Sequence, residues 1–217
     1  MKVAVLSESP ADEAAVWILV QGLLDVEGEL VPWPTPKTRG WRGVLNSADP
    51  VLHYLHYSTD ADALVITLDS DLSPVHQRGH DQPGGAADKC GLCQLRATVD
   101  SVQSQLRPRE KRGPIQTALG LAVPAVEAWY LAGRDPHVSE TTWLLGMESG
   151  KFPYTKLDLK QMVYGTERPS LALEQQCAVE HARRLVQEEK LELLENLFPS
   201  GFGTLAADVR SWRATQV

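Results

Sequence analysis

The sequence is poor in cysteine and has no long apolar segment. Its three cysteines, an odd number, provide no disulfide framework, which agrees with a reducing compartment. No apolar run approaches the roughly 18 to 20 residues needed to cross a bilayer. The first residues, MKVAVLSESP, lack the long apolar stretch of a secretory signal. We therefore expect a cytoplasmic protein without a membrane partner.

The chain also lacks an excess of positive charge. Its formal net charge of -7 argues against a protein that coats nucleic acid by bulk electrostatics, because phosphate binding relies on lysine and arginine. One local basic segment remains, formed by Arg107, Arg109, Lys111 and Arg112. This segment could contact a nucleic-acid backbone or be a solvated loop. The excess of acid also fits clustered carboxylates that a bound cation neutralises.

Apolar runs of strand length alternate with segments of helical periodicity in the first part of the chain. The predicted strands are residues 3–6, 30–33, 63–68 and 117–123. Helices are predicted over residues 11–24 and over residues 92–106. Another helix is predicted to start at the capping segment of residues 47–50, and a further one from residue 127 onward. Strands that alternate with helices imply crossover connections and a parallel sheet. The sequence therefore predicts the α/β class, with a Rossmann-like parallel sheet flanked by helices.

The strand pattern stops at about Gly133. Residues 171–197 have the periodicity of one long or two shorter amphipathic helices. We therefore predict an α/β core over residues 1–135 and a helical extension over residues 136–217 that packs on this core.

Acidic residues follow two of the predicted strands. Glu8 comes directly after the first strand, and Asp69 and Asp71 end a buried central strand. Ligands of an open parallel sheet bind outside the carboxyl ends of its strands, so we expect the three carboxylates to meet there. In a near-extended Asp-x-Asp segment, both side chains point the same way and can face one ion. Their repulsion requires a cation, and Mg²⁺, or Mn²⁺ in its place, suits oxygen ligands and phosphate chemistry.

Several segments resemble the Toprim domain of topoisomerases, primases and overcoming-lysogenization-defect nucleases. The segments that resemble this domain are SESPADEAAV and ALVITLDSDLS. Three later segments look like parts of small Toprim-like proteins of bacterial defence loci: LAVPAVEAWYLAG, LDLKQMVYG and FPSGFGTLAADVRSW. The resemblance implies a metal-dependent nuclease or nickase acting on DNA or RNA, and an ATPase protein partner in phage defence. Glu8 would then act near the scissile phosphate, and Asp69 and Asp71 would hold the metal. Ser9 stands where the family usually has glycine, which argues against topoisomerase-like chemistry.

Two further residues belong to the predicted site. The resemblance favours Glu127 as a metal ligand or structural anchor, and Lys160 could hold a phosphate or neutralise charge in a transition state. Each candidate also has an ordinary structural interpretation. Asp69 and Asp71 could be turn residues, and Lys160 could be solvated. Acids in the first turn of a helix are common without a function, which applies to Glu8, Asp12, Glu13 and Glu127.

A second constellation has the spacing of a zinc site. It consists of His76, His80, Cys90 and Cys93, a His-x3-His pair followed by a Cys-x2-Cys pair. Four such ligands could close a tetrahedral Zn²⁺ site and order a loop that is rich in glycine and proline. The two cysteines could instead be small apolar residues that pack at the start of a helix.

Two other functions remain open. The segment LDSDL is compatible with the nucleophile motif of a haloacid-dehalogenase-like phosphatase, although it lies far from the N-terminus and Ser73 replaces the usual threonine. The chain could also be a non-catalytic module with a Toprim-like fold that binds a partner protein. Its interface would then come from the C-terminal helices, where Leu191, Leu194 and Leu197 recur at helical spacing.

Overall fold

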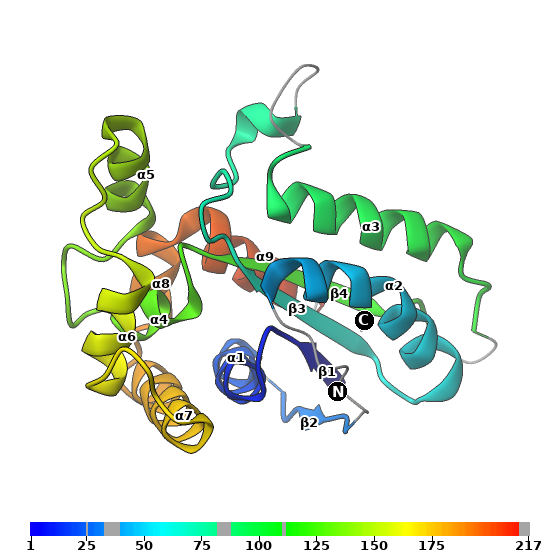
Figure 1. Cartoon of the computed structure of the whole chain (residues 1–217). Helices are drawn as coiled ribbons and strands as arrows, with labels where there is room; N and C mark the ends of the chain where they lie inside the picture. Colours follow the sequence, from blue (N-terminus) through cyan, green and yellow to red (C-terminus); the bar gives the residue numbers. More distant parts are fainter. Residues whose placement is uncertain (25, 33–39, 82–87, 110–111, 213–217) are drawn as a thin grey trace.

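The computed structural model describes residues 1–24, 26–32, 40–81, 88–109 and 112–212. Within these residues one parallel sheet of four strands forms the centre of the molecule, in the order β2-β1-β3-β4 (Figure 1). The strands are β1 Lys2–Leu6, β2 Glu29–Leu30, β3 Ala63–Asp69 and β4 Gln116–Ala122. The predicted α/β class is therefore confirmed.

Helices cover both faces of this sheet. Their bounds are α1 Pro10–Leu23, α2 Gly40–Ser58, α3 Gly91–Gln105, α4 Val126–Tyr130, α5 Glu140–Ser149, α6 Lys156–Tyr164, α7 Leu171–Gln187, α8 Leu191–Leu197 and α9 Thr204–Ser211, with short helical turns η1 Arg78–Asp81 and η2 Pro199–Gly203. Helices α2 and α3 pack on one face, and α1 and α9 pack on the other (Figure 1). None of the helices in the described parts of the chain combines the length and apolar character that crossing a membrane requires.

Strand β3 is the central element of the core. Every residue from Ala63 to Leu68 is buried, as expected for a parallel strand that is covered on both faces. It pairs with β1 on one side and with β4 on the other. Strand β1 pairs with β2 on its other edge. The strands that follow β1 in sequence are therefore added first on one side of it, as β2, and then on the other side, as β3 and β4. In this strand order, the change of side opens a crevice at the carboxyl ends of β1 and β3.

The predicted start of the second helix was wrong. Helix α2 begins at Gly40, about seven residues before the predicted cap, and continues through Pro50. Proline inside a helix costs about 3 kcal/mol or more, whereas burying one large aliphatic side chain contributes about 1.5 to 3 kcal/mol. Pro50 lies on the exposed side, and the opposite side buries Val44, Ala48, Val51, Leu52 and Leu55. Packing of the whole apolar face therefore outweighs the local penalty.

The second strand is shorter than expected. Strand β2 comprises Glu29–Leu30 and pairs with the start of β1, whereas the sequence predicted residues 30–33. Trp33, the last residue of that prediction, lies outside the described residues.

The C-terminal part is helical and packs on the core. Residues 171–197 form two helices, α7 and α8, which is one of the two predicted alternatives. Helix α7 lies against α1, and α9 lies against β4. Between them, η2 is held by buried Glu140, whose carboxylate accepts hydrogen bonds from the backbone N–H groups of Ser200 and Gly201 at 2.9 and 2.7 Å.

Replacing Gly201 with alanine is expected to destabilise the protein. A Cβ atom at this position would lie 2.0 Å from the backbone oxygen of Leu121 in β4, and backbone cannot yield as a flexible side chain does. We expect a loss of about 3 kcal/mol in the free energy of unfolding, measured by urea denaturation. Gly203 provides the matched control, since its added Cβ would meet nothing closer than 3.4 Å. Equal effects of the two substitutions would contradict this account of how η2 docks.

Candidate functional site

A cleft opens at the carboxyl edge of the sheet, at the crevice between β1 and β3. It has a volume of about 450 Å³. Three of its carboxylates come from the ends of different strands: Glu8 follows β1, Asp69 ends β3 and Glu127 follows β4. The placement of Glu8 and Asp69 at one edge agrees with the sequence expectation, whereas Asp71, the third expected carboxylate, is not among the residues that line this cleft. Whether these residues hold a metal stays a prediction.

Glu8 and Asp69 are in direct contact. The backbone N–H of Asp69 donates to Oε1 of Glu8 at 2.9 Å, and Oδ1 of Asp69 accepts from the backbone N–H of Val126 at 3.0 Å. Burial and the neighbouring Asp69 carboxylate raise the pKa of Glu8 to about 7. Burial also raises the pKa of Asp69 above its usual value, although the Lys156 ammonium opposes this shift. The two side chains are therefore held in place by backbone N–H groups, one at the end of β3 and one at the first residue of α4.

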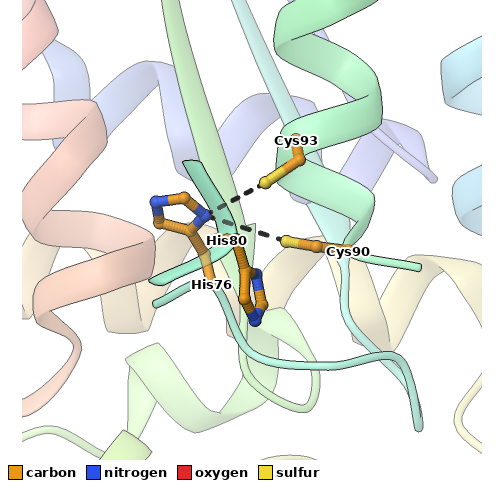
Figure 2. Close-up of side chains that lie close together, drawn as sticks. All are labelled: His76, His80, Cys90 and Cys93. Atoms are coloured by element: carbon orange, nitrogen blue, oxygen red, sulfur yellow. Dashed lines mark hydrogen bonds between the residues drawn. The ribbon is translucent and has the colours of Figure 1, made fainter. Parts of the chain in front are cut away.

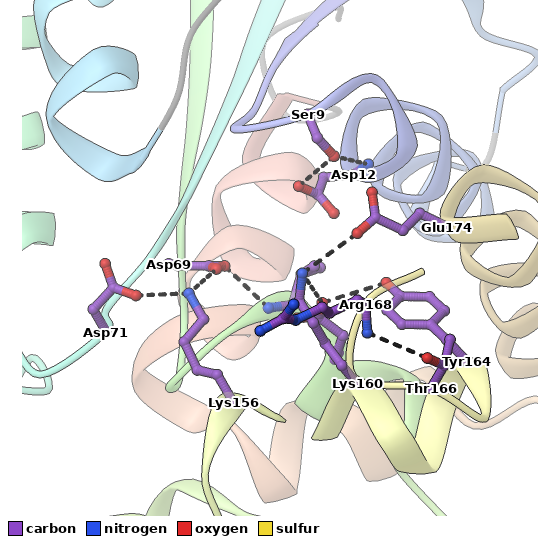
Figure 3. Close-up of polar contacts among 12 residues, drawn as sticks. Ser9, Asp12, Asp69, Asp71, Lys156, Lys160, Tyr164, Thr166, Arg168 and Glu174 are labelled. Carbon is purple, nitrogen blue, oxygen red and sulfur yellow. Dashed lines mark hydrogen bonds and ion pairs between the residues drawn. The ribbon is translucent and has the colours of Figure 1, made fainter. Parts of the chain in front are cut away.

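Asp12 adds a carboxylate that the sequence suggested only as an ordinary first-turn acid. Ser9 caps helix α1, and its hydroxyl accepts from the backbone N–H of Asp12 at 3.2 Å and donates to Oδ2 of Asp12 at 2.8 Å (Figure 3). Burial, followed by the charges of Asp69 and Glu127, raises the pKa of Asp12 well above its usual value. Glu13 does not line the cleft, and burial raises its pKa to about 7.

Lys156 is the principal residue that sequence reasoning missed. Its Nζ atom donates to Oδ2 of Asp69 at 2.7 Å and to Oδ1 of Asp71 at 2.6 Å (Figure 3). Burial of the ammonium lowers its pKa, but the two aspartates raise it by more, so the pKa lies above the usual value. The Asp-x-Asp pair therefore meets around one cation, and in this structure that cation is an ammonium group.

The expected near-extended conformation of the Asp-x-Asp segment was wrong. The strand ends at Asp69, and Asp71 has φ of 50°, in the left-handed region that aspartate tolerates better than most residues. The backbone N–H of Asp71 donates to the carbonyl oxygen of Pro124 at 3.0 Å, which fixes this turn. Both carboxylates still contact Lys156, because the turn at Asp71, and not the alternation of a strand, directs the Asp71 side chain toward the ammonium group.

The sequence did contain a local signal for Lys156. Thr155 and Asp158 form a capping box, which makes Lys156 the first residue of helix α6. A lysine at a helix N-terminus meets the positive end of the helix dipole, an unfavourable arrangement that invites a compensating anion. Asp69 and Asp71 provide that anion.

Lys160 and Glu127 face each other across the cleft. Lys160 is part-buried and lies 3.3 Å from Glu174 and 3.9 Å from Glu127, so its interpretation as a solvated residue was wrong. The Tyr164 hydroxyl donates to Oε1 of Glu127 at 3.4 Å. Burial, with the Asp69 charge, raises the pKa of Glu127 to about 7. Both residues therefore line the cleft, as a role in the predicted site requires.

The cleft carries more negative than positive groups. Among the described residues, its lining holds the carboxylates of Glu8, Asp12, Asp69, Glu127 and Glu174 and the ammonium groups of Lys156 and Lys160. Carboxylates that are packed together raise one another's pKa unless a cation compensates them. The donors are carboxylate oxygens, which is the ligand set that Mg²⁺ prefers. The residues present therefore fit a divalent cation, which has to displace Lys156 from Asp69 and Asp71 or bind on the side of Glu8, Asp12 and Glu127.

The basic segment lies at the opposite edge of the sheet. The Arg109 guanidinium donates to the carbonyl oxygens of Ala61 and Gly113, just before β3 and β4 begin. Arg112 donates to the carbonyl oxygen of Asp60. These groups hold the amino-terminal edge together, which favours a structural role over contact with a ligand in the cleft. Lys111 lies outside the described residues.

The predicted zinc ligands also come together. Atoms of His76, His80, Cys90 and Cys93 that could bind a metal all lie within 4.8 Å of one another. This cluster is separate from the residues that line the carboxylate cleft.

No protein-family model, curated protein or solved structure matches this chain.

Proposed function

We propose that this chain is a metal-dependent phosphodiesterase that cleaves or nicks DNA or RNA. The observation that carries the proposal is the convergence of Glu8 and Asp69, at the ends of β1 and β3, with Glu127 of helix α4 in one cleft that holds more carboxyl than ammonium groups. A structural ion-pair network needs no such surplus, whereas a site for a divalent cation does. The resemblance to Toprim domains supports the same chemistry.

The lysines of the cleft suit an anionic substrate. Lys156 and Lys160 are the ammonium groups in its lining, and each is already held by carboxylates. When bound, Mg²⁺ or Mn²⁺ would activate water and stabilise the leaving oxygen of a phosphodiester. Asp69, with Glu8, Asp12 or Glu127, would hold the ion. Lys156, once released from Asp69 and Asp71, could then contact a phosphate oxygen.

Glu8 is suited to move a proton. In the metal-free chain its pKa of about 7 lies near the operating pH, where a general acid or base works best. Its carboxylate is oriented by the backbone N–H of Asp69, so it keeps one direction in the cleft. We therefore assign Glu8 the proton transfer beside the scissile phosphate for an ion that Asp69 holds with Asp12 or Glu127 and not with Glu8.

The partner and the biological setting stay predictions. An ATPase partner and a role in phage defence follow from the resemblance alone, and no contact among the described residues bears on them.

The proposal is tested by incubating the purified chain with supercoiled plasmid, single-stranded DNA and RNA. We expect cleavage or nicking of at least one substrate with Mg²⁺ or Mn²⁺, and none with EDTA. Cleavage that persists in EDTA would contradict the proposal. Turnover of a phosphate monoester without nucleic-acid cleavage would favour the phosphatase alternative. Absence of both activities, together with no heat of Mn²⁺ binding in calorimetry, would favour a non-catalytic binding module.

A further inference from the structure

The residues His76, His80, Cys90 and Cys93 form a compact cluster between β3 and α3 (Figure 2). His76 lies in the connection after β3, and His80 lies in η1. Cys90 is the residue that precedes α3, and Cys93 lies in its first turn. Four side chains from two separated stretches of an irregular connection therefore point to one place.

Two of the distances within the cluster fall in the range of a tetrahedral metal site. Nδ1 of His76 lies 3.3 Å from Sγ of Cys93 and 3.8 Å from Sγ of Cys90. Ligand atoms bound to one tetrahedral Zn²⁺, at bond lengths of about 2.0 to 2.3 Å, are separated by roughly 3.3 to 3.8 Å. The rings of His76 and His80 stand nearly perpendicular, at 86°, with centroids 5.6 Å apart. Only a small contraction is needed to close the site.

One ring nitrogen of the cluster has no hydrogen-bond partner among the described residues. This atom is Nδ1 of His80, which is buried. Cys90 occupies the N-cap position of α3, and its thiol contacts Nδ1 of His76 at 3.8 Å instead of capping the helix. A buried ring nitrogen without a hydrogen-bond partner, next to two thiols, fits the ligand set of a metal ion.

We propose that His76, His80, Cys90 and Cys93 bind one structural Zn²⁺. Two thiolates balance the charge of the ion, and two neutral imidazoles complete its shell. The ion joins the connection after β3 to the start of α3. His76 follows the Asp-x-Asp segment closely in the sequence, so zinc binding at His76 also restrains Asp71. The proposal stands on residues apart from the carboxylate cleft and does not depend on the proposed function.

Zinc binding to His76 is expected to change the contact between this residue and Arg96. Nε2 of His76 lies 3.2 Å from a guanidinium nitrogen of Arg96, so in the absence of metal it accepts a hydrogen bond. Zinc on Nδ1 leaves the ring proton on Nε2. Two donors then face each other, and the Arg96 side chain has to turn away. Metal binding is therefore coupled to a movement of Arg96 on α3.

Metal content of the purified chain tests the proposal. The protein is prepared with reductant and without chelator, supplied with Zn²⁺, dialysed and measured by atomic emission. We expect about one zinc per chain. Cys93→Ser should reduce it to below about one tenth, whereas Cys177→Ser, at the third cysteine of the chain, should leave it unchanged. Co²⁺ exchanged into the unmodified protein should give a thiolate-to-cobalt absorption band, a readout that does not depend on how the variants fold.

Three results would overturn the proposal. One is a zinc content near zero in a folded chain with three reactive thiols. Another is a Cys90–Cys93 disulfide that persists in the reduced preparation and leaves a single reactive thiol. The third is zinc that remains bound in Cys93→Ser while Co²⁺ in the unmodified chain shows no thiolate band.

Discussion

Asp69→Asn is expected to reduce metal-dependent cleavage by roughly 10²- to 10³-fold. Asparagine is isosteric with aspartate, and its side-chain oxygen can still accept the 3.0 Å hydrogen bond from the Val126 N–H group. What disappears is the charge that would bind the cation and that now holds Lys156. The loss is measured as the rate of nicking or cleavage at saturating Mg²⁺ or Mn²⁺, on the substrate that the unmodified chain cleaves best.

Asp100→Asn supplies the matched control for this substitution. It makes the same change of charge at an exposed position of α3 and should leave the rate within about twofold. Thermal unfolding of both variants checks that the fold persists. An Asp69→Asn variant that cleaves as fast as the Asp100→Asn control would refute the assignment of the cleft as the active site.

The stability of the metal-free chain is expected to fall as pH rises from about 5 to about 8. Burial raises the pKa values of Glu8 and Glu127 to about 7, so between 4.5 and 7 the folded state holds protons that the unfolded state has released. Stability is therefore higher at the acid end of this window. One pKa unit corresponds to about 1.4 kcal/mol, so the nearly buried Glu127 alone accounts for a loss on the order of 3 kcal/mol. Urea denaturation at constant ionic strength measures the profile.

Divalent metal should flatten this pH profile. Because a bound cation favours the ionised carboxylates, Mg²⁺ or Mn²⁺ should stabilise the chain at pH 8 and have little effect at pH 5. Glu127→Gln, which cannot ionise, should show a weaker pH dependence without metal, whereas Glu167→Gln at an exposed position should match the unmodified chain. A profile that rises from pH 5 to pH 8, or that Glu127→Gln leaves unaltered, is incompatible with the electrostatics derived for the cleft.

The sheet could be predicted from sequence because its strands have strong local signals. Residues 63–68 are apolar except for Thr67, and a strand that is buried on both faces favours such a run. The start of α2 could not be predicted, because Pro50 looks like a first-turn residue until the whole buried face of the helix is known. Local propensity failed where packing outweighed it.

The site was partly predictable for a similar reason. Glu8 and Asp69 directly follow strands, so the geometry of a parallel sheet is enough to bring them together. Lys156 comes from the helical region, and its contact with Asp69 and Asp71 spans more than 80 residues of sequence. No periodicity encodes such a contact, since it depends on how α6 is placed beyond the sheet edge. The backbone conformation of Asp71 depends on its hydrogen bond to the carbonyl oxygen of Pro124 and could not be predicted from the sequence either.

In the proposed function, the acidic groups at the carboxyl edge of the sheet bind a divalent cation. A crystal grown with Mn²⁺ would locate this ion by its anomalous signal, without reference to activity. We expect a peak in the cleft that is bound by Asp69 and by at least one of Glu8, Asp12 and Glu127. A cleft without a peak at saturating Mn²⁺, with Lys156 still bound between Asp69 and Asp71, would contradict this expectation.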